Sequence, residues 1–178
     1  MKTITNIFSA VIMMIAPLIS DSSFGQTPKL TDPEIASVAV TANQIDINYA
    51  KIAKEKSKNA DVLKFAATMA SDHQSVIDQA VALVKKLGVT PKDNEVSKKL
   101  NADAETTKKM LRTKSGNAFN KAYIHNEVAY HKAVIETVQN LLIPQAQNAE
   151  LKALLEKVLP ILKAHLEHAE MVQKMFAK

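Results

Sequence analysis

The stretch between Asn59 and Gly88 most constrains the fold, because it carries one apolar stripe at helical spacing along its whole length. The stripe consists of Val62, Phe65, Met69, His73, Ile77, Ala80, Val84 and Leu87. Residues three or four apart share one helix face, so the pattern predicts a helix that buries this face. Asn59 is a good N-cap, Gly88 ends the helix and Pro91 prevents its continuation. At 1.5 Å per residue the helix would be about 40 Å long.

The same spacing recurs along most of the remaining chain. Only three glycines occur, which is too few for a sheet-rich or loop-rich fold. We therefore predict an all-α domain with four long helices and one shorter connecting helix. The expected helices cover residues 31–56, 59–88, 94–114, 118–143 and 148–176. Pro144 is expected to stop the fourth of these, and Pro160 is expected to kink the last one.

The N-terminal segment has the pattern of a secretory signal. Residues 7–19 form a short apolar run without charge, and Ser23-Phe24-Gly25 provides small residues before a cleavage position at Gln26. A run of this length is shorter than a membrane span. We expect a signal peptide over residues 1–25, a linker over 26–31 and one domain over 32–178, exported to a bacterial periplasm. An uncleaved N-terminal anchor is the alternative.

Composition excludes several classes of function. The chain has no cysteine, which excludes disulfides, thiolate chemistry and lipoprotein attachment. Its formal net charge is +5, but the lysines fall in scattered pairs without interleaved aromatic residues. A solvated helix surface explains this pattern better than nucleic-acid binding. No nucleophile motif is present, so we name no catalytic residue. The sequence identifies no partner and leaves self-association open.

Polar residues interrupt the apolar stripes at a few positions. His73, His131 and His165 each do so on a different predicted helix. Glu127 precedes His131 by four residues and therefore shares its face. Asp46 lies at the edge of the buried face of the first helix. If these helices form one bundle, the candidate ligands of a metal ion are His73, His131, His165, Glu127 and Asp46.

Two interpretations of these residues remain open. Three imidazoles and two carboxylates suit zinc, iron, manganese or copper, and they suit magnesium and calcium poorly. Alternatively, the histidines belong to a metal-free polar core, held by Asp46, Glu127, Tyr49, Tyr130 or buried water. Asp72 is adjacent to His73 and is a candidate partner for its other ring nitrogen.

Three segments carry a family resemblance. Residues 65–73 (FAATMASDH) are similar to the motif F-A-x-x-M-x-x-D-H, and residues 159–166 (LPILKAHL) are similar to L-P-x-L-x-x-H-L. Between them lie residues 118–123 (AFNKAY), followed by Val128 and His131. In this order the segments resemble the bacterial family called domain of unknown function 4142, over about residues 32–176.

The resemblance implies a ferritin-like four-helix bundle and an exported protein, and it implies no established activity. It places His73, His131 and His165 within the motifs of the family. Di-iron ferritin-like proteins carry Glu-x-x-His on two helices. Here Ala70 and Leu162 stand three residues before His73 and His165, so a di-iron centre is not expected.

Three functions are compatible with these residues. The first is a metal-binding or metal-dependent stress protein of the cell envelope. The second is a non-enzymatic interaction module with a metal-free core and a functional surface near residues 92–114. The third is an oxidoreductase that uses a single metal ion.

Overall fold

The computed structural model describes residues 28–176, and these residues contain helices and no strand. The expected all-α class is therefore confirmed. The long helices are α1 (Asp32–Lys56), α2 (Ala60–Lys86), α4 (Gly116–Thr137) and α6 (Ala149–Met175), and α3 (Glu95–Arg112) is shorter. Two further turns follow α4, namely the π-helical η1 (Val138–Leu142) and α5 (Ile143–Gln145). The predicted signal peptide and the start of the predicted linker lie outside the described residues.

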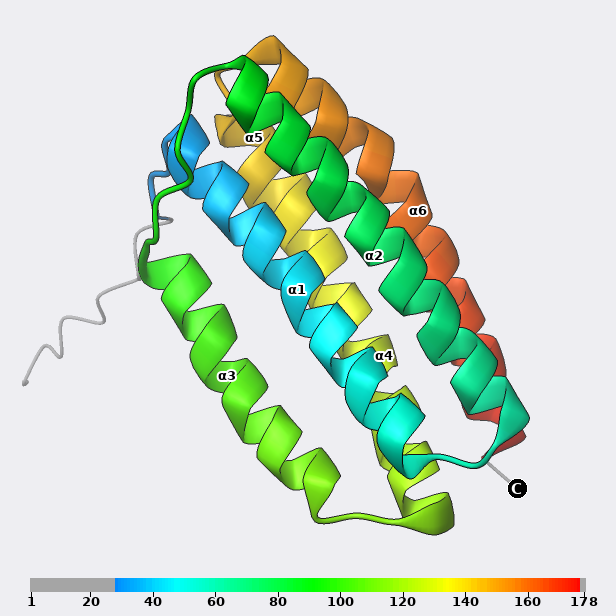
Figure 1. Cartoon of the computed structure of the whole chain (residues 1–178). Coiled ribbons are helices and arrows are strands. Elements are labelled where there is room, and N and C mark those ends of the chain that lie inside the picture. Colours follow the sequence, from blue (N-terminus) through cyan, green and yellow to red (C-terminus); the bar gives the residue numbers. More distant parts are fainter. Residues whose placement is uncertain (1–27, 177–178) are drawn as a thin grey trace, which may run out of the picture.

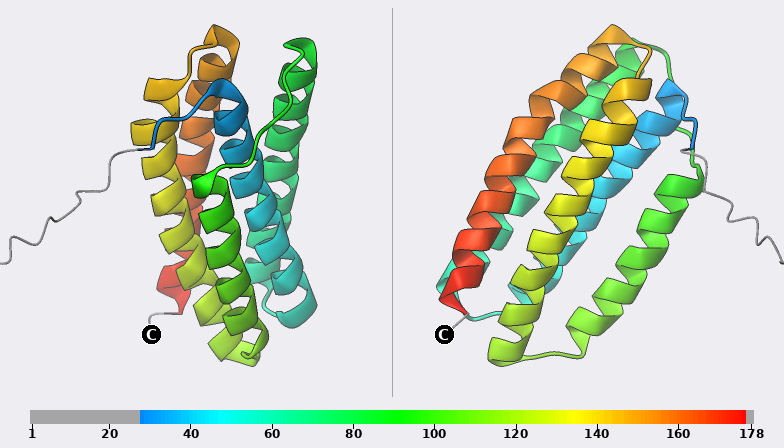
Figure 2. Two further views of the ribbon diagram at one scale, coloured as in Figure 1. Left: turned by 90° about the vertical axis from the view of Figure 1, so that its left-hand side faces the viewer. Right: turned by 180° about the vertical axis from the view of Figure 1, so that it is seen from behind.

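The long helices lie side by side in two layers. In Figure 1, α1 and α2 form the front layer and α4 and α6 lie behind them. The helices of each layer run in opposite directions, whereas α2 and α4, which are connected through α3, run in the same direction. The views in Figure 2 agree with this arrangement and place α3 at one side of the bundle, next to α1 and α4. None of the described helices combines the length and the apolar character that crossing a membrane requires.

Asparagines cap the starts of three helices. The side-chain oxygen of Asn59 accepts a hydrogen bond from the Val62 amide at 3.0 Å, and Asn148 accepts from Leu151 at 3.1 Å. Both bonds satisfy backbone donors that have no partner within the helix. The start of α1 is also fixed to the turn before α6, because the Asp32 carboxylate accepts from the Asn148 amide at 2.9 Å. The cap expected from the sequence at Asn59 is confirmed.

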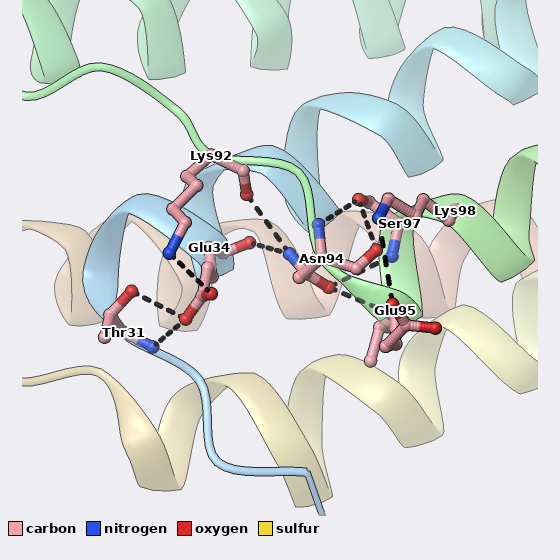
Figure 3. A network of polar contacts seen from close by, with 8 residues as sticks. Thr31, Glu34, Lys92, Asn94, Glu95, Ser97 and Lys98 are labelled. Carbon is pink, nitrogen blue, oxygen red and sulfur yellow. Dashed lines mark hydrogen bonds and ion pairs between the residues drawn. The ribbon is translucent and has the colours of Figure 1, made fainter.

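Asn94 caps α3 and also ties this helix to the start of α1 (Figure 3). Its side-chain oxygen accepts from the Ser97 amide at 3.1 Å, while its side-chain nitrogen donates to the Glu34 carbonyl at 3.1 Å. Beside it, the Lys92 ammonium lies 3.6 Å from the Glu34 carboxylate. These contacts hold the first turn of α3 against α1.

The end of α4 differs from the prediction. The α-helical pattern stops at Thr137, and the chain continues through η1 into α5, which contains Pro144. Proline is tolerated in the first turn of a helix because its missing N–H has no partner there. Pro144 therefore begins a new turn. The prediction that it stops the helix at Ile143 was wrong. At Pro160, α6 continues as one helix from Ala149 to Met175.

The buried apolar residues form two clusters, one toward each end of the bundle. One cluster includes Phe65, Phe119 and Tyr123, and the other includes Ile35 and Leu142. On α2, for example, Val62, Phe65 and Met69 belong to the first cluster and Val76 belongs to the second. Each of the long helices passes from one cluster to the other. A layer of polar side chains lies between them.

Candidate metal centre

The polar layer brings together all five residues proposed from the sequence. Asp46 comes from α1, His73 from α2, Glu127 and His131 from α4, and His165 from α6. Their exposed fractions do not exceed 5%. Spacing of three or four along each helix places them on the faces that also carry the apolar core, so packing of the core forces these polar groups inward.

The three imidazoles lie against one another. The ring centroids are separated by 5.6 Å for His73 and His131, 5.1 Å for His73 and His165, and 5.6 Å for His131 and His165. One nitrogen of each ring lies within 4.8 Å of a nitrogen of each other ring. One carboxylate oxygen of Asp46, one of Glu127 and one ring nitrogen of His131 also lie within 4.8 Å of one another. Imidazole nitrogens at this spacing can bind a single metal ion after small adjustments.

Hydrogen bonds on the outer side of two rings determine which nitrogen carries the proton. His73 Nδ1 lies 2.7 Å from Asn43 Oδ1, and the Asn43 amide nitrogen donates to the Ala39 carbonyl at 2.8 Å. Asn43 therefore presents an acceptor, and His73 Nδ1 must donate to it. His131 Nδ1 donates in the same way to the Glu127 carbonyl at 3.0 Å.

The third ring is held by a carboxylate on a neighbouring helix. His165 Nε2 lies 3.0 Å from Oδ2 of Asp72 and donates to it. In a neutral imidazole the nitrogen opposite the N–H carries a lone pair. The inner nitrogens of all three rings are therefore acceptors, and each is buried without a hydrogen-bond partner: His73 Nε2, His131 Nε2 and His165 Nδ1.

The carboxylates add further acceptors to the same layer. Asp46 Oδ2 lies 3.4 Å from His73 Nε2 and 3.6 Å from His131 Nε2. Glu127 Oε2 lies 3.7 Å from His131 Nδ1. All four carboxylate oxygens of Asp46 and Glu127 are buried without a hydrogen-bond partner. Buried polar groups without partners are unfavourable, and a cation would satisfy several of them together.

Burial also shifts the protonation of these groups toward their neutral forms. It raises the pKa of Asp46 to about 7. Burial and the neighbouring charge of Asp46 raise the pKa of Glu127 well above its usual range. Burial, together with the charge of the neighbouring histidines, lowers the pKa of His73 to about 2 and that of His131 to about 4. Neutral imidazole is the form that binds metals.

A small cavity adjoins these ligand atoms. Its volume is about 10 Å³, which matches one water-sized occupant. Its walls include Asp46, His73 and His131, together with Ala42, Asn43, Tyr130, Val134 and Leu162. Asp46, His73 and His131 therefore adjoin a space of about the size of one ion, whereas Glu127 and His165 are not among its wall residues.

Two partners of the histidines differ from the sequence prediction. Asp72 does not hold His73; it holds His165, because adjacent residues on a helix point about 100° apart. Asn43 holds His73 and was not proposed as its partner. Its position three residues before Asp46 is the signal that could have identified it. Tyr130, proposed as a partner of a histidine, instead donates to the Ala42 carbonyl at 2.9 Å.

The comparison with known families bears on this arrangement. The model of the family "Domain of unknown function (DUF4142)" matches residues 20–172. The chain belongs to this family. No functionally curated protein matches the chain. Membership in the DUF4142 family confirms the resemblance found in the sequence motifs, and it assigns no activity.

A solved structure shares the fold. The structure described as "CopM in the Cu(II)-bound form" superposes with a TM-score of 0.60 at 16% sequence identity. The likeness covers 82% of this chain and 98% of that one. At this identity it shows a common helical arrangement for this member of the DUF4142 family.

Proposed function

We propose that the protein binds one transition-metal ion in its polar layer. His73, His131 and His165 supply the nitrogens, Asp46 supplies an oxygen, and Glu127 completes the ligand set. One observation carries this proposal: three inner imidazole nitrogens, each made an acceptor by a bond on its outer side, are buried without a donor. Bonds to acceptors on the outer nitrogens are the usual way in which proteins orient metal-binding histidines.

Copper is the first metal to test. Imidazole binds copper and zinc well, and the order of stability favours Cu(II) among the divalent ions. CopM, whose fold is similar, was solved in a Cu(II)-bound form. Magnesium and calcium prefer sites made of oxygen ligands alone, so three imidazoles disfavour them.

The test is the metal content of the protein purified without chelator, measured by elemental mass spectrometry. We expect close to one ion per chain in the wild type and almost none in His131→Ala. His125→Ala is the matched control, because His125 is an exposed histidine on the same helix. It should keep the metal. Circular dichroism checks that each variant folds. If His131→Ala does not fold, Asp46→Asn replaces it as the variant expected to lose the metal.

Metal content that is equal in all variants would contradict the proposed ligands. The same holds if the wild type takes up neither copper nor zinc after the ion is added and the excess is removed. The layer would then be a metal-free polar core, and the functional surface would be sought on residues 92–114.

We also infer that the protein is exported and acts in the cell envelope. The charge-free run over residues 7–19 and the small residues before Gln26 support this inference. The intact mass of the protein from an envelope fraction tests it. A chain that begins at Gln26 is expected, and a chain that keeps residues 1–25 would contradict cleavage.

We infer further that the bundle is of the ferritin-like type, with α3 as an additional helix. Supporting this, α1, α2, α4 and α6 each contribute a side chain to one central polar layer. Ferritin-like proteins build their metal sites from inward-facing side chains of a helical bundle in the same manner. An experimental structure with the metal bound would test the helix order and the ligand set together.

A further inference from the structure

A second and larger cavity lies next to the polar layer. Its volume is about 300 Å³. It shares wall residues with the small cavity of the polar layer, namely Ala42, Asn43, Tyr130, Val134 and Leu162. Protein interiors are packed so closely that few voids exceed the size of a water molecule. A space of this size within the bundle therefore calls for an occupant.

The inner walls of this cavity are apolar. Val76, Ile77 and Ala80 line it from α2, and Leu155 and Val158 line it from α6. The π-helical turn η1 adds Val138 and Leu142. Such walls offer almost no partners to water and favour contact with an apolar molecule.

The cavity reaches the surface between α3 and α4. Three exposed residues line it there, namely Asp103 of α3 and Ala129 and Ala133 of α4. Figure 2 (right) shows α3 beside α4 on this side of the molecule. A ligand can therefore enter here without opening the contacts between the long helices.

The polar groups at this mouth define the charge of the ligand. None of the described residues that line the cavity is basic, and Asp103 is acidic. This carboxylate is paired with the Lys99 ammonium at 2.9 Å, so an anionic molecule such as a fatty acid would find no free counter-charge in the wall. The side-chain nitrogen of Asn126, also in the wall, is buried and has no hydrogen-bond partner. It can donate to an oxygen of the ligand.

Cavity volume sets the size of the ligand. A cavity of about 150 Å³ binds benzene, so about 300 Å³ accommodates roughly twelve carbon atoms. This volume is at the lower end of the range for small-molecule sites.

We propose that this cavity binds an uncharged, mainly hydrocarbon molecule of about ten to twelve carbon atoms, with one carbonyl or hydroxyl oxygen that accepts a hydrogen bond from Asn126. The hydrocarbon part lies between α2 and α6, and the oxygen lies toward α3 and α4. This binding goes beyond the proposed metal function and does not depend on it. A chelator should therefore leave it unchanged.

Calorimetric titration of the protein with 2-decanone tests the proposal. We expect saturable binding of one molecule per chain. Ala80→Phe and Ala133→Phe place a ring in the cavity and should weaken binding at least tenfold. Val81→Phe is the matched control, because Val81 follows Ala80 but is 52% exposed and does not line the cavity. It should bind as the wild type does.

Two comparisons test the chemistry of the ligand. Decanoate should bind at least tenfold more weakly than 2-decanone. Asn126→Leu should weaken binding of 2-decanone about tenfold while leaving butylbenzene, which has no oxygen, unaffected. Equal binding of decanoate would overturn the assignment of an uncharged ligand, and an unchanged ketone affinity in Asn126→Leu would overturn the role of Asn126.

The proposal as a whole fails if the wild type shows no saturable binding, or if both phenylalanine variants bind 2-decanone as the wild type does. Ala133 lies at the exposed mouth, where a larger side chain can be accommodated. Ala133→Phe therefore keeps the test decisive even if Ala80→Phe does not fold.

Discussion

Asp72 of α2 accepts a hydrogen bond from His165 of α6, with 3.0 Å between Oδ2 and Nε2. The bond joins two helices and leaves Nδ1 of His165 facing the polar layer. A carboxylate in this position fixes the ring and makes its other nitrogen a better ligand. Asp72 thus contributes to metal binding in the proposed site although it touches no metal.

Replacing Asp72 with asparagine should lower metal affinity about tenfold, because the amide lacks the charge that strengthens the ligand. Folding stability should change little, since the Asp72 side chain is 43% exposed. Competition titration with a copper or zinc chelator measures the affinity. Asp78→Asn, on the same helix, is the control. An affinity for Asp72→Asn equal to that of the control would show that this bond only packs the bundle.

Replacing Asp46 with asparagine should stabilise the metal-free protein at alkaline pH while weakening metal binding. The folded state holds a proton on Asp46 up to a pKa of about 7, against an ordinary value of 3.8. Stability from this group is therefore present at low pH and lost as pH rises through about 7. Asparagine cannot ionise, so at pH 9 the variant should be more stable by about 2–4 kcal/mol in urea unfolding. Equal stability of the variant and the wild type at pH 9 would mean that ionised Asp46 already has polar partners in the folded protein.

Metal affinity should fall as pH falls through about 7. Below this value Asp46 is protonated in the metal-free protein, and the ion must displace that proton. Titrations at pH 6, 7 and 8, each in two buffers of different ionisation enthalpy, give the affinity and the number of protons released. Asp46→Asn should remove this fall in affinity near pH 7. If the affinity of the variant still falls near pH 7 as that of the wild type does, another group supplies the proton.

Replacing Asn94 with alanine should destabilise the protein by about 1–2 kcal/mol and should loosen α3. The change removes the cap of α3 and the bond to the Glu34 carbonyl. Urea unfolding measures the loss, and hydrogen exchange should be faster in α3 than in α2. Asn101→Ala, at an exposed position of α3, should have a small or opposite effect, because alanine is the better helix former. Equal effects of the two changes would argue against the cap.

The positions of the helices could be predicted from the sequence because the signals are local. The stripe from Val62 to Leu87 and the cap Asn59 act within one helix, and the structure confirms the helix they predict. The turn η1 could not be predicted, since a π-turn needs only a shift of one hydrogen bond and has no distinctive residue type. Pro144 could not be interpreted correctly without that turn.

The membership of the polar layer was also predictable, but its pairing was not. His73, His131 and His165 interrupt apolar faces, so packing brings them together whatever the details of the helix arrangement. Which acceptor holds each ring depends on the rotation of one helix against another, as for His165 and Asp72. The larger cavity depends in turn on small side chains from several helices that lie at one level. Periodicity within single helices does not contain this information.

The distribution of the candidate ligands over α1, α2, α4 and α6 has a consequence for the lifetime of the folded protein. Detachment of any one of these helices would remove a ligand, and no single helix holds more than two of the five residues. A bound ion therefore opposes the earliest steps of unfolding at every long helix, and its release and the opening of the bundle become linked events. Binding of the metal ion would lengthen the half-life of the native state, which is a kinetic property separate from equilibrium stability.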